Sequence, residues 1–306
     1  MRERAQTENG VIVFLTSTDH GYTIGDYLDG PGAALADRIV HRTYPEVLAA
    51  APGDLARFVP GTWIFSDIER MQPAMATAAA RLWSALEKAG CRLLNHPTRA
   101  LRRYELLRLL HDRGDNGFDV QRLTDRREPR RWPVFLRRDD NHTGALTPLL
   151  HTPDAYREAV ADIERRNWPH QSTIAVEFLD TADADGLYRK YGAFQIGETI
   201  VPGHMDTSRN WVVKDADLDN ADERRRELAF LDGNPWTAAI RAAFRMARLD
   251  YGRIDFSLHG ERVVVWEINT NPLIASPASL RPDRSEVAER LFARFAAALT
   301  ALDPAS

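Results

Sequence analysis

Cysteine and lysine are the residues that this sequence almost lacks. Cys91 is the only cysteine among 306 residues, which excludes an internal disulfide framework and a metal cluster held by several cysteines. Lysine supplies three of the 40 basic residues, so most cationic roles must fall to arginine. The sequence has no apolar run near the roughly 20 residues of a membrane span and no apolar signal-peptide core at its start. We therefore expect a cytoplasmic protein that does not bind membranes.

Several common catalytic motifs are missing as well. The sequence has no G-x-x-x-x-G-K-[ST] phosphate loop, no G-x-S-x-G nucleophile elbow and no H-E-x-x-H metal motif. A formal net charge of −4 argues against a general nucleic-acid surface, so we expect no nucleic-acid partner. What remains is an ordinary globular composition, 44% hydrophobic and 27% charged, in a chain long enough for two or three compact domains.

Hydrophobic periodicity predicts a mixed α/β chain. Its first part has the pattern of strand, strand, helix and short strand, an order that favours an open α/β layer, at residues 10–18, 61–67, 72–90 and 91–95. The later part alternates between helical and strand patterns. We expect helices at 96–114, 153–166, 222–232, 235–248 and 284–302, and strands or hairpins at 132–138, 172–180, 187–205 and 253–272.

The hairpin "RIDFSLHGERVVVWEINTNP" at 253–272 carries polar side chains within an apolar run. Glu267 and Asn269 are two residues apart, so a strand places both on one face. A turn centred near Glu261 places Asp255 across from Glu267. Two such carboxylates need a compensating charge when they are buried, and with the amide they form a hard-oxygen set suited to Mg²⁺ or Mn²⁺. The alternative is an Asp and a Glu on the solvated face of an ordinary hairpin.

These residues resemble the metal-binding hairpin of the ATP-grasp superfamily, of the RimK-like or carboxylate–amine ligase type. That family has Asp on one strand and Glu-x-Asn ending the next, followed by a turn with proline, here Pro272. The resemblance implies an α+β (α/β) fold with an N-terminal open α/β domain at 1–95, a lid subdomain at 96–180 and a C-terminal antiparallel-sheet domain at 181–306. It also implies that Asp255, Glu267 and Asn269 hold Mg²⁺ or Mn²⁺ on the phosphates of ATP.

Further positions follow from the resemblance. Arg103 and Arg137 occupy the places of the usual phosphate-binding lysines, and Lys190 or Arg189 would also face the phosphates. Arginine can bind phosphate with two parallel donors, although it is not interchangeable with lysine. The residues that would hold the adenosine are Glu177, Phe178, Leu179 and Asp180. Arg209 and Asn210 fall where family members often contact the transferred phosphate or acyl group, and they join Lys190 as the expected catalytic residues.

Two other segments bear on the site. The expected lid loop, residues 137–148, has one glycine, Gly144, and carries Asp139 and Asp140 where anions would approach. Within it, His142 is interpreted either as a phosphate or gating residue or as a surface histidine. The loop at 17–30 follows the first strand and offers Asp19, His20 and Tyr22 for acceptor recognition, with a solvated loop as the alternative.

The implied activity is an ATP- and Mg²⁺-dependent ligase that joins a carboxylate to an amine through an acylphosphate and releases ADP and phosphate. Its partners would be small-molecule or peptide carboxylate and amine substrates, and a homo-oligomer is left open. Two alternatives remain, an ATP-grasp kinase that phosphorylates a hydroxyl acceptor and a non-catalytic ATP-grasp-like binding protein. For the ligase, Glu267→Gln should abolish turnover and leave the fold intact.

Overall fold

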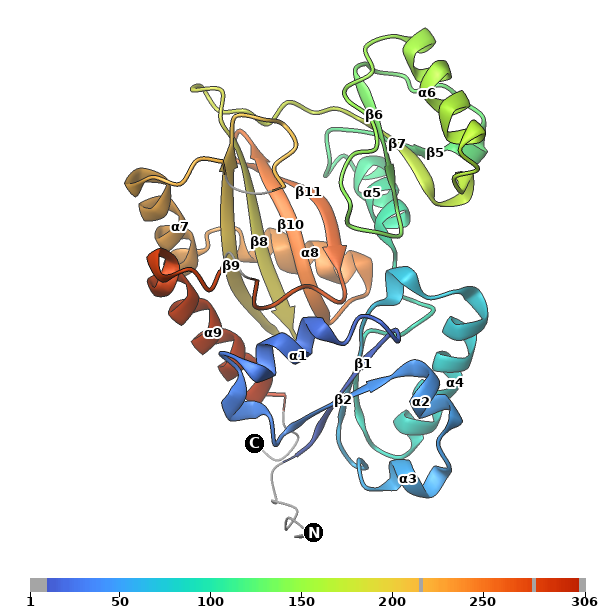
Figure 1. Cartoon of the computed structure of the whole chain (residues 1–306), viewed down its shortest axis with the longest axis vertical. Helices are drawn as coiled ribbons and strands as arrows, with labels where there is room; N and C mark the ends of the chain where they lie inside the picture. The colour runs from blue at the N-terminus through green and yellow to red at the C-terminus, as the bar shows by residue number, and fades with distance from the viewer. Residues whose placement is uncertain (1–9, 215–216, 277–278, 303–306) are drawn as a thin grey trace.

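The computed structural model describes residues 10–214, 217–276 and 279–302, which are arranged around three sheets (Figure 1). The first sheet is parallel, with the order β2-β1-β3-β4. Its elements are β1 (Ile12–Thr16), α1 (Tyr22–Asp29), β2 (Ile39–Thr43), α2 (Tyr44–Ala49), α3 (Pro52–Ala56), β3 (Thr62–Phe65), α4 (Pro73–Lys88) and β4 (Arg92–Leu94). Every residue of β1 and β3 is buried, as expected for central strands of a parallel sheet.

The second sheet is antiparallel, has the order β5-β7-β6 and lies in the segment expected to form the lid subdomain, so this part of the chain is called the lid below. Its elements are α5 (Arg103–Asp112), β5 (Val120–Arg122), β6 (Val134–Arg138), α6 (Pro153–Arg165) and β7 (Thr173–Glu177). Tyr156 and Ile163 of α6 pack against Val134 and Leu136 of β6 and Ala175 of β7. The lid therefore has a small hydrophobic core of its own.

The third sheet is antiparallel and central, with the order β11-β10-β8-β9. Its elements are β8 (Tyr188–Ile196), β9 (Thr199–Ser208), α7 (Ala221–Gly233), α8 (Thr237–Ala247), β10 (Tyr251–His259), β11 (Arg262–Asn269) and α9 (Ser285–Thr300). Ile254 and Phe256 of β10 share a core cluster with Phe244 of α8. Because side chains alternate along a strand, Arg253 and Asp255 face the opposite side of the sheet.

Helix α9 joins the central sheet to the N-terminal part of the chain. Phe295 lies edge-on to Phe194 of β8, with ring centroids 5.0 Å apart, and to Tyr27 of α1, at 5.2 Å. The side-chain amide of Asn95 also spans the two parts, since it donates to Tyr251 O at 2.8 Å and accepts from Tyr251 N at 2.9 Å. These contacts fix the position of the hairpin β10–β11 against the N-terminal sheet.

The predicted fold class is confirmed, and most predicted elements are present. The helix expected at 96–114 begins only at Arg103, because residues 96–100 form turns. The short strands β2 and β5 were not predicted, since each has few apolar residues. Among the described helices, none combines the length and the apolar character that a bilayer crossing requires.

Candidate functional site

The hairpin β10–β11 has the Asp255–Glu267 pair that its sequence predicted, although the turn is centred between Gly260 and Glu261 and not at Glu261. Asp255 pairs with Glu267, and Arg253 pairs with Asn269. Phe256 then pairs with Val265, so Trp266 is the extra residue of a β-bulge in β11. The carboxylates of Asp255 and Glu267 therefore occur as neighbours on the face of the sheet that is turned away from α8.

Glu267 is neutralised by cationic side chains of the lid. Its carboxylate accepts hydrogen bonds from Arg103, from Arg137 Nη2 at 3.0 Å and from His142 Nδ1 at 3.3 Å. Burial opposes ionisation of Glu267, but Arg103, His142 and Arg137 outweigh it and hold its pKa well below the usual range. The compensating charge that the sequence called for is thus present within the protein.

Asp255 has a counter-ion of its own on the same strand. Arg253 Nε donates to it at 2.8 Å, and the attraction of Arg253 and Lys190 overcomes burial and lowers the pKa of Asp255. Lys190 donates from Nζ to Val213 O at 2.8 Å and lies 3.4 Å from Asp206 Oδ2. The face therefore alternates cations and carboxylates at close range.

A cavity of about 330 Å³ lies between this face and the lid. One part of its wall is apolar and is formed by Phe135, Phe178, Leu179, Trp211 and Trp266. The other part is ionic and includes Arg137, His142, Lys190, Arg253, Asp255 and Glu267. A volume of this size is at the lower end of the range for small-molecule sites. The cavity can hold a ligand with an apolar end and an anionic end.

The arrangement of the three sheets is similar to that of several solved ligases. D-alanine–D-alanine ligase from Bacillus anthracis, crystallised with ATP, matches with a TM-score of 0.55 over 96% of this chain and 97% of its own, at 11% identity. The RimK domain ATP-grasp protein from Sphaerobacter thermophilus DSM 20745 matches with 0.50 over 95% and 99%, at 16% identity. The L-amino acid ligase from Bacillus licheniformis matches with 0.50 over 86% and 68%, at 12% identity. The chain has an ATP-grasp fold. Comparison of the sequence with protein-family models and with curated proteins gave no match.

Within this ATP-grasp fold, six of the predicted site residues line the cavity, namely Arg137, Phe178, Leu179, Lys190, Asp255 and Glu267. Asn269 lies next to Glu267 on β11, and its Oδ1 accepts from Asn271 N at 2.8 Å. The predicted metal set is thus brought together on one strand pair. The ligand atoms of this set suit a hard divalent cation, because two carboxylates and an amide supply oxygen ligands. Such an ion would have to replace the arginine contacts of Glu267.

The other predicted residues lie outside the cavity wall. Arg103 is buried below it, where its Nη1 donates to Arg138 O at 2.6 Å and to Asn141 O at 2.7 Å. Glu177 accepts from Arg131 N and from Asp119 N, both at 3.0 Å, which ties the lid together. The side chains at Asp180, Arg209 and Asn210 are exposed. The predicted ligand contacts of these residues stay predictions.

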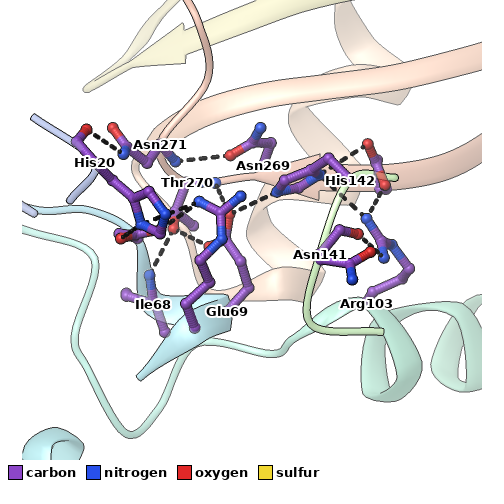
Figure 2. Close-up of polar contacts among 12 residues, drawn as sticks. His20, Ile68, Glu69, Arg103, Asn141, His142, Asn269, Thr270 and Asn271 are labelled. Carbon is purple, nitrogen blue, oxygen red and sulfur yellow. Dashed lines mark hydrogen bonds and ion pairs between the residues drawn. The ribbon is translucent and has the colours of Figure 1, made fainter. Parts of the chain in front are cut away.

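Arg253 and Glu69 are residues of the site that were not singled out from the sequence, as are the wall residues Phe135, Trp211 and Trp266. Arg253 precedes Asp255 by two positions in a strand, and this spacing could have placed it on the same face. Glu69 lies in η2 (Ile68–Arg70), and its Oε1 is 3.2 Å from His142 Nε2. His142 is in the cavity wall and bonded to two carboxylates, so it is not a free surface histidine (Figure 2). Its contact with phosphate stays a prediction.

His204 on β9 gives the ionic face a testable pH dependence. Its ring lies against Gly192, where a Cβ atom would be 2.2 Å from His204 Cε1. Burial lowers the pKa of His204 to about 4, although Asp206 acts in the opposite direction. The unfolded chain therefore takes up this proton near pH 6.5 and the folded chain only near pH 4. Stability contributed by neutral His204 is complete above pH 6.5 and is lost as the pH falls through 4.

The free energy of unfolding of the wild type should fall between pH 7 and pH 4.5. We expect that of His204→Gln to fall less, by a difference of at most about 3 kcal/mol. Urea unfolding of wild type and variant at both pH values measures this difference, since the other titrating groups act equally in both proteins. His259→Gln, at the exposed end of β10, is the control and should follow wild type. Equal pH dependence of wild type and His204→Gln would contradict the assignment.

Proposed function

We propose that the chain is an ATP- and Mg²⁺-dependent ligase that joins a carboxylate to an amine through an acylphosphate and releases ADP and phosphate. The observation that carries this proposal is the division of the cavity into an apolar part and an ionic part. A nucleoside triphosphate has the same division, with a flat base at one end and a polyphosphate at the other. The solved relative from Bacillus anthracis that was crystallised with ATP has the same fold.

The apolar part would receive the adenosine. Phe178 and Leu179 follow β7 and line this part, and Trp211 lies edge-on to Phe178, with ring centroids 5.7 Å apart. Aromatic walls of this kind give a planar base a large contact area at low entropic cost. Glu177 would act by holding this segment through Arg131, and Asp180 would contact the ligand at the rim of the cavity.

The ionic part would receive the phosphates. Arg137 and Lys190 line it, and the buried Nε of Arg137 has no hydrogen-bond partner among the described residues. Arg103 would reach the phosphates only by leaving Glu267. Asp255, Glu267 and Asn269 would hold Mg²⁺, which would neutralise phosphate charge and polarise the transferred group.

The reaction needs positioning and charge neutralisation more than covalent chemistry. An oxygen of the acid attacks the γ-phosphorus, and the bond to the ADP oxygen breaks. The amine nitrogen then attacks the acyl carbon, phosphate leaves, and the amine proton passes to solvent. Arg137 and Lys190 would balance the negative charge that develops on the phosphoryl oxygens. Arg209 and Asn210 precede Trp211 and would contact the acyl or phosphoryl group from the rim.

We expect ATP and ADP to raise the Tm of the wild-type protein, with a larger rise when Mg²⁺ is present. A ligand at 100 times its Kd adds about 2.7 kcal/mol to the free energy of unfolding. Lys190→Met should reduce the rise, because Lys190 lines the ionic part of the cavity. Lys88→Met is a matched control, since Lys88 is an exposed lysine of α4. Thermal shift with and without EDTA measures these effects.

The same preparation distinguishes the three functions. A panel of carboxylic acids incubated with MgATP and hydroxylamine should give a hydroxamate for the true acid, because hydroxylamine traps an acylphosphate. ADP release with a stable phosphorylated alcohol and no hydroxamate would indicate the kinase. Absence of any nucleotide-induced shift at millimolar concentration would contradict both enzymes and favour a non-catalytic binding protein.

A further inference from the structure

We propose that Glu69, a residue of the N-terminal sheet region, is a positioning residue that acts on Glu267 through His142. The cavity would then have its full ionic wall only while the part of the lid loop that follows β6, residues 139–148, bridges Glu69 and Glu267. The part of this inference that concerns nucleotide binding rests on the proposed function. The part that concerns the lid loop can be tested without a nucleotide.

Glu69 is fixed to the end of β11 by Thr270. The hydroxyl of Thr270 donates to Glu69 Oε2, and Thr270 N donates to Oε1 at 3.3 Å. Thr270 Oγ1 also accepts from Ile68 N at 2.9 Å. Figure 2 shows Glu69 and Thr270 in the middle of a row of polar side chains that runs from His20 to His142. These bonds fix the carboxylate of Glu69 independently of its contact with His142.

The turn that precedes Glu69 has an unusual backbone. Asp67 has a φ of 58°, in the left-handed region, and is fully buried. Its carboxylate accepts from His20 Nδ1 at 2.7 Å, from Arg70 Nη1 at 2.8 Å and from Ser17 N at 3.2 Å. Such a conformation is unfavourable for a residue with a Cβ atom and persists where the surroundings determine it. These bonds direct the next residues of the turn toward β11.

His142 uses both ring nitrogens to join two carboxylates. Nε2 is 3.2 Å from Glu69 Oε1, and Nδ1 is 3.3 Å from Glu267 Oε1. The ring therefore links two parts of the chain, the turn at Glu69 and the strand β11.

The link also determines the wall of the cavity. His142, Gly144 and Ala145 of the lid loop line the cavity, and Arg103 holds the backbone of the loop at Asn141 O. Glu267 thus receives His142, one of its three cationic partners, only when the loop is in this position. Removal of the Glu69 carboxylate frees one end of His142 and lets the loop and the Glu267 carboxylate move.

The first test is hydrogen exchange of the nucleotide-free protein. Glu69→Gln should accelerate exchange of the lid-loop amides, and His142→Gln should do the same. The double variant should exchange no faster than His142→Gln alone, because Glu69 acts through that ring. Unchanged exchange in Glu69→Gln, or additive effects in the double variant, would overturn the proposal.

The second test is ADP affinity with Mg²⁺, measured by calorimetry. Residues that support a ligand-binding group from behind typically contribute about 10- to 100-fold, so Glu69→Gln should weaken ADP binding by at least about tenfold.

Glu46→Gln is the matched control. Glu46 belongs to the capping box of α2, so this variant should lose stability but keep wild-type affinity. A Glu69→Gln protein with reduced Tm and unchanged affinity would show a purely structural role and overturn the nucleotide part. Absence of binding by the wild type would overturn the proposed function, and the exchange test would still decide the role of Glu69.

Discussion

Glu267→Gln should lower the free energy of unfolding by about 3–5 kcal/mol at pH 7. Removal of one partner from a buried ion pair leaves the other charge without compensation, and effects of this size result. Here the variant would deprive two arginines and a histidine, Arg103, Arg137 and His142, of their common carboxylate. The charged form of Arg137 is already disfavoured, since burial and the nearby Arg103 lower its pKa to about 10.

Urea unfolding in EDTA measures this effect without a contribution from metal ions. Glu261→Gln is the matched control, because Glu261 is exposed at the turn of the same hairpin. A surface substitution of this kind should stay within about 0.5 kcal/mol of wild type. A midpoint for Glu267→Gln equal to that of Glu261→Gln would show that the arginine contacts of Glu267 do not stabilise the fold.

An added anion should partly reverse the loss. The variant leaves three cationic groups without their common negative charge, so pyrophosphate should raise the Tm of Glu267→Gln more than that of wild type. Turnover should stay absent even with pyrophosphate removed and MgATP added, because the metal set is incomplete. Restored stability without restored turnover would separate the two roles of Glu267, that of counter-ion and that of metal ligand.

The sequence leads to a different expectation for this variant. The hairpin pattern indicates a carboxylate that needs compensation, and a metal is the partner that local spacing suggests. A variant would then lose the metal and keep the fold. The actual partners of Glu267 lie 125 residues away, at His142, and 164 residues away, at Arg103. Contacts at such separation depend on how the lid packs, and no local pattern contains that information.

The Asp255–Glu267 pair could be predicted because strand alternation and the position of the turn are local features. The details that produce the pair could not: the connection is only Gly260 and Glu261, and the bulge at Trp266 shifts the register by one residue. The wall residues Phe178 and Leu179 were also located from one strand pattern and the resemblance. Glu69 could not be located, because it lies in a short turn and acts only through a loop 73 residues further along the chain.

Gly252→Ala should be the second most damaging change, because Gly252 allows β10 to approach β11 where the predicted metal ligands lie. A Cβ atom at Gly252 would be 2.7 Å from the backbone oxygen of Asn269, and φ is 153°. The backbone conformation alone costs about 1–3 kcal/mol for other residues. The carbonyl of Asn269 cannot move without displacing the end of β11, so the contact adds to this cost.

Gly260→Ala separates the two contributions. Gly260 lies in the turn of the same hairpin at a φ of 63°, and a Cβ atom there would meet no atom within 4 Å. That variant should lose only about 1–2 kcal/mol, the cost of a left-handed backbone for a residue with a Cβ atom. Gly252→Ala should lose more in urea unfolding and should also reduce the Mg²⁺-dependent Tm rise with ADP, because Asn269 is displaced. Equal stability of the two variants, with an unchanged Tm rise in Gly252→Ala, would show that close approach at Gly252 does not position Asn269.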